Sequence, residues 1–142
     1  MGDALQVARE NVDAFNAHDE ARLRATYADD VVQDVPGDRI EGGDRATAYV
    51  AMWLRAFPDA RQTIVKELAS GDWVVQEFTV AGTHTETLAA PDGEVPATNR
   101  RVTTRGVQVL RVQGGRIVEE HVYFDELQLL GQLGLLPEPA AV

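Results

Sequence analysis

The spacing of apolar residues near the start of the chain predicts a helix with one buried side. Between residues 3 and 18, apolar side chains recur at intervals of three and four, at Leu5, Ala8, Val12 and Phe15. These positions form a single stripe, because one turn of a helix takes about 3.6 residues. We therefore expect a helix over residues 3–18.

Two further helices and one strand are predicted before residue 58. Asp19 can cap a short helix that runs to about residue 28, because its side-chain oxygen can accept from the free amides of a first turn. The segment DDVVQDVPG is typical of a strand that its Pro-Gly pair ends. A third helix, ended by Pro58, is predicted by apolar residues with helical spacing at Ala46, Tyr49, Val50, Trp53, Leu54 and Phe57.

The second half of the chain changes to alternating, β-branched runs, which are typical of strands. These runs cover residues 61–88, 100–112 and 116–124, with breaks at SGD, APDGEVPATN and QGG. We interpret them as hairpin-linked antiparallel strands. A closing helix over residues 125–133 follows, and we expect the tail 138–142 to be loose.

Helices that precede a meander of long strands predict an α+β fold, in which a curved antiparallel sheet wraps around the N-terminal helices. The twist of the long strands, together with Gly82 and Gly106, should bend the sheet and leave a cone with an internal pocket. A chain of 142 residues fits one domain, for which we expect a core over residues 3–137. Apolar hollows of this kind are where small ligands bind.

Composition limits the possible partners. The net charge of −10 repels phosphate backbones and anionic lipids, so we expect neither nucleic acid nor membrane partners and favour a small organic molecule. The absence of cysteine excludes disulfides, thiolate nucleophiles and zinc–thiolate sites. The opening MGDALQVARE resembles no secretory signal, so a cytoplasmic location is expected.

Asp125 is the first candidate for chemistry, because it lies where the last strand changes to helical spacing. A period of two places Asp125, His121 and Tyr123 on one face of that strand. Asp125 followed by Gln128 is also a capping box, which is a structural role. A capping role and a catalytic role in an apolar pocket predict opposite pKa shifts for Asp125. Backbone amides stabilise the carboxylate and lower its pKa, whereas apolar burial raises it.

Three segments resemble SnoaL-like polyketide cyclases, which share a cone-shaped fold with ketosteroid isomerase and nuclear transport factor. They are FPDARQTIVKELASGDWVVQEFTVAGTHT, GVQVLRVQGGRIVEEHVYFD and LLGQLGLLP, and the likeness spans about residues 6–137. The resemblance implies an intramolecular aldol closure without a metal or organic cofactor. It implies that Asp125 acts as general acid and base on a polyketide-like or other apolar carbonyl substrate.

Other polar and aromatic residues could share such a site. His84 and Glu86 fall on one strand face, either at the mouth of a pocket or at an exposed hairpin end, and the resemblance favours His84 as a donor to a substrate carbonyl. His121 is either a pocket residue or a core histidine. Tyr49 and Trp53 lie on the inward stripe of the third helix, where they serve core packing or line the pocket.

Two further functions remain open. The segment VVQDVP also resembles a strand of limonene-type epoxide hydrolases. In this chain Asp34, within that segment, is either a turn residue or a pocket group. An epoxide hydrolase of this kind would use a variant site of His84, Glu86 and Asp125 to activate a water. The third hypothesis is a non-catalytic binding protein, in which Asp125 only caps its helix. We also expect a homodimer through an apolar outer sheet face that contains Val75, Val107 and Val109.

Overall fold

The computed structural model describes residues 3–90 and 93–136 and has four helices and eight strands within these ranges. The helices are α1 (Asp3–Asn16), α2 (Glu20–Thr26), α3 (Gly43–Ala56) and α4 (Glu126–Gln132). The strands are β1 (Tyr27–Val35), β2 (Asp38–Glu41), β3 (Arg61–Ser70), β4 (Trp73–Thr83), β5 (Leu88–Ala90), β6 (Gly93–Val95), β7 (Arg101–Gln113) and β8 (Arg116–Phe124).

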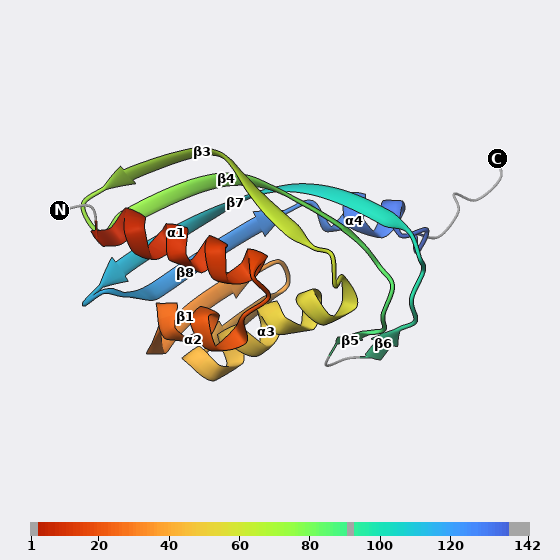
Figure 1. Cartoon of the computed structure of the whole chain (residues 1–142), viewed down its shortest axis with the longest axis horizontal. Coiled ribbons are helices and arrows are strands. Elements are labelled where there is room, and N and C mark those ends of the chain that lie inside the picture. Colours follow the sequence, from red (N-terminus) through yellow and green to blue (C-terminus); the bar gives the residue numbers. More distant parts are fainter. Residues whose placement is uncertain (1–2, 91–92, 137–142) are drawn as a thin grey trace.

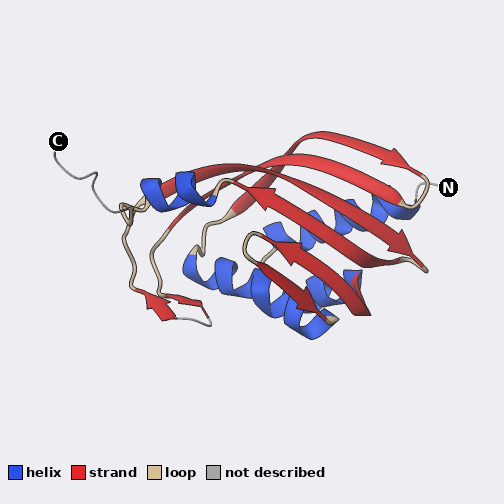
Figure 2. Cartoon of the chain, turned by 180° about the vertical axis from the view of Figure 1, so that it is seen from behind, coloured by secondary structure: helices blue, strands red, loops and turns tan. Residues whose placement is uncertain are grey.

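Six strands form one curved sheet in the order β2-β1-β8-β7-β4-β3, and β5 and β6 form a separate hairpin. Helices α1, α2 and α3 lie together on the concave side of the sheet (Figure 1). Viewed from behind, the sheet covers these three helices, and α4 lies beyond the end of β8 (Figure 2). The α+β class and the cone shape that the sequence predicts are confirmed.

One strand pair differs from the expected antiparallel sheet, since β1 and β8 run parallel. Strand β2 and the β5–β6 hairpin were also not predicted, because these segments of three or four residues are too short to show alternation. The expected helices are present, and the Asp19 side chain caps α2 by accepting from the Arg22 amide at 3.1 Å. The predicted loose tail lies outside the described residues.

Gly106 and Gly82 allow other groups to approach the curved strands closely. A Cβ on Gly106 would lie 2.6 Å from Cζ of Phe78 and 2.7 Å from the carbonyl oxygen of Tyr123. A Cβ on Gly82 would lie 3.3 Å from Cα of Ala60. Glycine at position 106 therefore lets the Phe78 ring pack across β7 on the inside of the bend.

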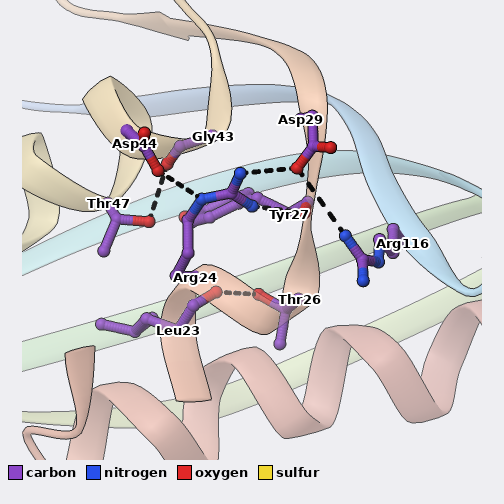
Figure 3. A network of polar contacts seen from close by, with 9 residues as sticks. All are labelled: Leu23, Arg24, Thr26, Tyr27, Asp29, Gly43, Asp44, Thr47 and Arg116. Carbon is purple, nitrogen blue, oxygen red and sulfur yellow. Dashed lines mark hydrogen bonds and ion pairs between the residues drawn. The ribbon is translucent and has the colours of Figure 1, made fainter. Parts of the chain in front are cut away.

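Arg24 joins α2, α3 and the start of β1 (Figure 3). Its Nε donates to Asp44 Oδ1 at 2.7 Å, and its Nη2 donates to Asp29 Oδ1 at 2.6 Å. Its Nη1 donates to the carbonyl oxygen of Tyr27 at 3.1 Å. This junction fixes the backbone of Tyr27, whose side chain points into the interior. Among the described residues, no helix is long and apolar enough to span a membrane.

Candidate active site

A cavity of about 140 Å³ lies between the concave face of the sheet and helices α1 and α3. Most of its wall is apolar and aromatic, with contributions from Phe15, Trp53, Phe57, Phe78, Val122 and Phe124. Polar side chains also reach it, from Asn11, Tyr27, Gln33, Thr104, Gln108 and Glu120. An apolar wall with a few polar groups is the usual composition of a small-molecule site.

The acid that reaches this cavity is Glu120, and the face of β8 that carries His121 and Tyr123 points the other way. Glu120, Val122 and Phe124 of β8 line the cavity, whereas His121 and Tyr123 do not. The reason is a register shift: Val112 pairs with Ile117, but Arg111 pairs with Glu119, so β8 has one extra residue there. A bulge of this kind reverses the inward and outward positions that follow it.

Asp125 is exposed to solvent and is the N-cap of α4. Its Oδ1 accepts from the backbone amide of Gln128 at 3.0 Å. The capping role is therefore confirmed, and the expectation that this carboxylate is shielded inside the pocket is wrong. The physical reason is the bulge in β8, together with the free amides of the helix that begins at Glu126.

Glu120 is buried, with 2% of its surface exposed. Its Oε1 accepts from Gln33 Nε2 at 2.5 Å and lies 3.4 Å from the hydroxyl of Tyr27. Burial raises the pKa of the Glu120 carboxyl, and the hydrogen bonds from Gln33 and Tyr27 oppose this effect only in part. A carboxyl group in these surroundings can both release and accept a proton nearer to neutral pH than an exposed glutamate.

Two tyrosines near Glu120 remain neutral hydrogen-bond donors. Burial raises the pKa of Tyr27 well above its ordinary value, and the negative charge of Glu120 raises it further. Burial also raises the pKa of Tyr49 to about 12. Tyr49 and Trp53 line the cavity and also pack against the core, so both roles considered for them are present, and their ring centroids lie 6.3 Å apart in an edge-to-face arrangement.

His84 lies in the interior but not in the cavity wall, since no part of it is exposed and it does not line the cavity. Its Nδ1 accepts from the Thr98 amide at 3.2 Å, and its ring stacks on Phe57 with centroids 5.1 Å apart. Burial lowers the pKa of His84. The imidazole therefore joins the end of β4 to the segment before β7, and both predicted placements, at a pocket mouth and at an exposed end, are wrong. Glu86 is exposed.

His121, Asp34 and Tyr123 lie on the outer face of the sheet, away from the cavity. His121 Nδ1 lies 3.0 Å from Asp34 Oδ2, and its Nε2 lies 2.8 Å from Glu119 Oε2. Tyr123 is 58% exposed. The structure thus brings His121 and Asp34 together, but not with the other predicted site residues, and none of the three lines the pocket. The alternative roles also differ from the structure, because His121 is not a core residue and Asp34 lies within β1 and not in a turn.

Two buried glutamines that sequence reasoning missed share one signal: Gln33 lines the cavity, and Gln76 is hydrogen-bonded to the cavity residue Gln108. Gln33 replaces an apolar residue in the buried row of β1, between Val31 and Val35, and Gln76 does so between Val74 and Phe78 of β4. Both glutamines are almost fully buried. A polar residue at an inward position of an apolar strand indicates a partner or a function, because an unpaired buried amide is unfavourable.

Comparisons with known proteins agree with this architecture. A family model described as SnoaL-like polyketide cyclase matches residues 5–133. AclR from Streptomyces galilaeus, a proposed hydroxylase, is 27% identical, with a TM-score of 0.80 over 97% of this chain and 89% of that chain. IdmH from Streptomyces antibioticus, a proposed polyketide cyclase, is 26% identical, with a TM-score of 0.74 over 92% of this chain and 98% of that chain.

An LEH-like epoxide hydrolase from M. tuberculosis shares the fold, with 23% identity and a TM-score of 0.70 over 92% of this chain and 89% of that chain. Comparison with curated proteins gives no significant match.

Proposed function

Because the chain belongs to the SnoaL-like polyketide cyclase family, we propose that it is an enzyme that closes a small carbonyl compound into a ring, with Glu120 as its acid and base. The observation that carries this proposal is a buried carboxyl group, with a raised pKa, in a largely apolar cavity. Glu120 thus takes the acid–base role for which the sequence had favoured Asp125.

The proposed reaction is an intramolecular aldol addition. The Glu120 carboxylate removes a proton from a carbon between two carbonyl groups, and the electron pair of the broken C–H bond forms an enolate. The enolate carbon attacks a second carbonyl carbon of the same molecule, so that a C–C bond forms and the electron pair moves to that oxygen. Glu120 then returns its proton to this oxygen, and the product is an isomer of the substrate.

The cavity can contribute in two further ways. Enclosure holds the two ends of a flexible substrate together, and such orientation can lower a barrier by several kcal/mol, on the order of 7 in favourable cases. The neutral hydroxyl of Tyr49 can donate to the enolate oxygen, whereas the hydroxyl proton of Tyr27 is directed at Glu120. The volume of about 140 Å³ is close to that of cavities that hold benzene, so we propose a substrate of about one ring in size.

Epoxide hydrolysis is the second candidate, because the fold is shared with an LEH-like epoxide hydrolase and Glu120 could instead activate a water. The residues that line the cavity in the described part of the chain include no arginine between two acids. A binding protein without turnover is the third candidate, and it would use the same apolar cavity without proton transfer.

Exchange of carbon-bound protons tests the proposal without knowledge of the natural substrate. Acetophenone and ethyl acetoacetate are incubated with the protein in deuterated water, and the loss of α-protons beyond the protein-free rate is followed by NMR. We expect the wild type to catalyse exchange and Glu120→Gln to lose at least about 100-fold of it, which is the usual contribution of a general base.

Asp125→Asn is the matched control, because it removes a solvent-exposed carboxylate just after β8 and should retain exchange. Equal rates in wild type and Glu120→Gln would contradict the proposal. Incorporation of oxygen-18 from labelled water into the diol formed from styrene oxide would favour the epoxide hydrolase instead.

A further inference from the structure

A row of polar side chains crosses the inner face of the sheet, although the residues above and below it are largely apolar. Its members lie on five strands that neighbour one another: Gln33 on β1, Glu120 on β8, Gln108 on β7, Gln76 on β4 and Glu67 on β3. We call this set the polar row. Only part of it is joined by hydrogen bonds, and the break lies at the cavity, between Glu120 and Gln108.

The hydrogen bonds on the β3 side of the polar row have a fixed direction. Arg9 of α1 donates from Nε to Glu67 Oε1 at 2.7 Å. Gln76 donates from Nε2 to Glu67 Oε2 at 3.0 Å, because a carboxylate can only accept. The Gln76 Oε1 is thereby turned toward β7, where it accepts from Gln108 Nε2 at 2.8 Å.

This direction decides which atom Gln108 offers to the cavity. Gln76 is completely buried and Gln108 is 5% exposed, so their amides have few alternative partners. One N–H of Gln108 Nε2 is used by Gln76, and the Gln108 carbonyl oxygen has no hydrogen-bond partner among the described residues, so this oxygen is an acceptor open to a ligand. The charge pair of Arg9 and Glu67 thus makes this wall of the cavity a hydrogen-bond acceptor.

The β1 side of the polar row presents an acceptor as well. Gln33 donates from Nε2 to Glu120, and its buried Oε1 has no hydrogen-bond partner among the described residues. Gln33 is 1% exposed and lines the cavity. An unpaired buried carbonyl is unfavourable, and a donor on a bound ligand would satisfy it. Two side-chain carbonyl groups therefore flank Glu120.

We propose that the cavity selects a carbonyl compound that also carries an enolic or phenolic hydroxyl group, and that this hydroxyl donates to Oε1 of Gln108. Gln108 is then a specificity-determining residue, whereas Gln76, Glu67 and Arg9 are positioning residues. The inference rests on the proposed function for the statement that the ligand is a substrate. The predicted preference for a donor can be measured by binding alone.

Reversal of the charge pair tests this inference. In the double variant Arg9→Glu with Glu67→Lys, a lysine donates to Gln76 Oε1, so Gln76 and Gln108 both turn over and Gln108 offers N–H to the cavity. Dissociation constants are measured by NMR titration for phenol, which can donate, and for acetophenone, which can only accept. We expect the wild type to prefer phenol and the reversed pair to shift the ratio of the two constants toward acetophenone by about tenfold.

Two further variants make the test specific. Gln108→Leu should lower the preference for phenol over acetophenone, measured as the ratio of the two dissociation constants, by about fivefold to tenfold. It keeps the test decisive if the reversed pair does not fold. Glu10→Arg with Arg22→Glu reverses another exposed ion pair of α1, which has no contact with the polar row, and should leave the ratio unchanged.

An unchanged ratio in Gln108→Leu, or a wild type that binds acetophenone more tightly than phenol or fails to bind phenol, would overturn the inference. These results differ from a failure of the proposed function. In that case proton exchange would be absent from the wild type, while the preference for phenol and its reversal would remain.

Discussion

Glu120 and Asp125 have opposite surroundings, although they are only five positions apart in the chain. Asp125 is solvated and accepts from a backbone amide, whereas Glu120 is buried between Gln33, Tyr27 and the apolar wall. Burial penalises the charged form of Glu120 and gives it the raised pKa that proton transfer near neutral pH requires.

Substitution Glu120→Gln should therefore change the pH dependence of stability. An acid with a raised pKa in the folded state stabilises the fold below its unfolded pKa, near 4.5, and this stability is lost as pH rises through the folded pKa. We expect the variant to be more stable than the wild type at pH 7, with a difference that shrinks toward pH 4. Urea denaturation at several pH values measures it, and a constant difference would contradict the expected burial cost.

Substitutions of Asp125 should affect stability through the cap and leave proton exchange intact. Asp125→Ala removes the acceptor for the Gln128 amide and should cost about 1 kcal/mol of unfolding free energy, whereas Asp125→Asn should cost only a few tenths, because asparagine caps almost as well as aspartate. Thermal denaturation tests this order. A loss of exchange in folded Asp125→Asn would return the catalytic role to this residue.

At the residue scale, side-chain orientations could be predicted where the helical or strand repeat of the sequence was uninterrupted. Tyr49 and Trp53 were placed correctly on the inward stripe of the third helix, because α3 is a regular helix. The inward face of β8 was predicted wrongly, because one extra residue between Ile117 and Glu119 reverses the alternation. A bulge is set by the pairing with β7 and leaves no clear mark in the sequence of β8 itself.

At the scale of elements, the bend of β7 depends on the absence of a side chain at Gly106. In Gly106→Ala the new Cβ would meet the Phe78 ring at 2.6 Å and the backbone oxygen of Tyr123 at 2.7 Å. The strand cannot yield without loss of pairing with β8, so we expect a destabilisation of about 1–3 kcal/mol, as for other overpacked positions. The midpoint of urea denaturation measures it.

Gly131→Ala is the matched control for this substitution. Gly131 lies in α4, where a Cβ would meet only the flexible end of Leu136 at 3.3 Å. Alanine is favoured over glycine in a helix by about 0.5–1 kcal/mol, so this variant should be neutral or more stable. Equal effects of the two substitutions would contradict the role of close packing at Gly106.

The helices and long strands could be predicted from the sequence because their patterns extend over many residues. The parallel pairing of β1 with β8 could not, because alternation shows that a segment is a strand but does not identify its neighbour. The cavity was expected from the curved sheet, but the polar row that crosses it depends on which strands lie side by side. Its glutamines are distant in the sequence and meet only in the folded sheet.

At the scale of the whole molecule, the outer face of the sheet carries an apolar surface. Val75, Val107 and Val109 are partly exposed there, and Trp73 and Tyr123, at 39% and 58% exposure, extend the surface. We propose that a second copy of the chain covers this face, as the sequence suggested. Apolar surfaces of this kind on a sheet favour symmetric pairing.

A charged residue at the centre of this face should separate the proposed dimer. We expect Val109→Lys to give a monomer in sedimentation equilibrium, since the charge would be buried between two copies. Leu127→Lys is the control, because Leu127 is exposed on α4, away from this face. A wild type that is monomeric at all concentrations would exclude the dimer.

The most direct measurement of the central claim is a titration of the Glu120 carboxyl carbon by NMR, with the signal assigned by its loss in Glu120→Gln. Burial in the apolar cavity predicts an apparent pKa above the ordinary value of 4.5, which moves again when phenol binds. A carboxyl group that titrates at or below 4.5, with or without phenol, would show that Glu120 is solvated or firmly ionised, and would contradict its proposed role in proton transfer.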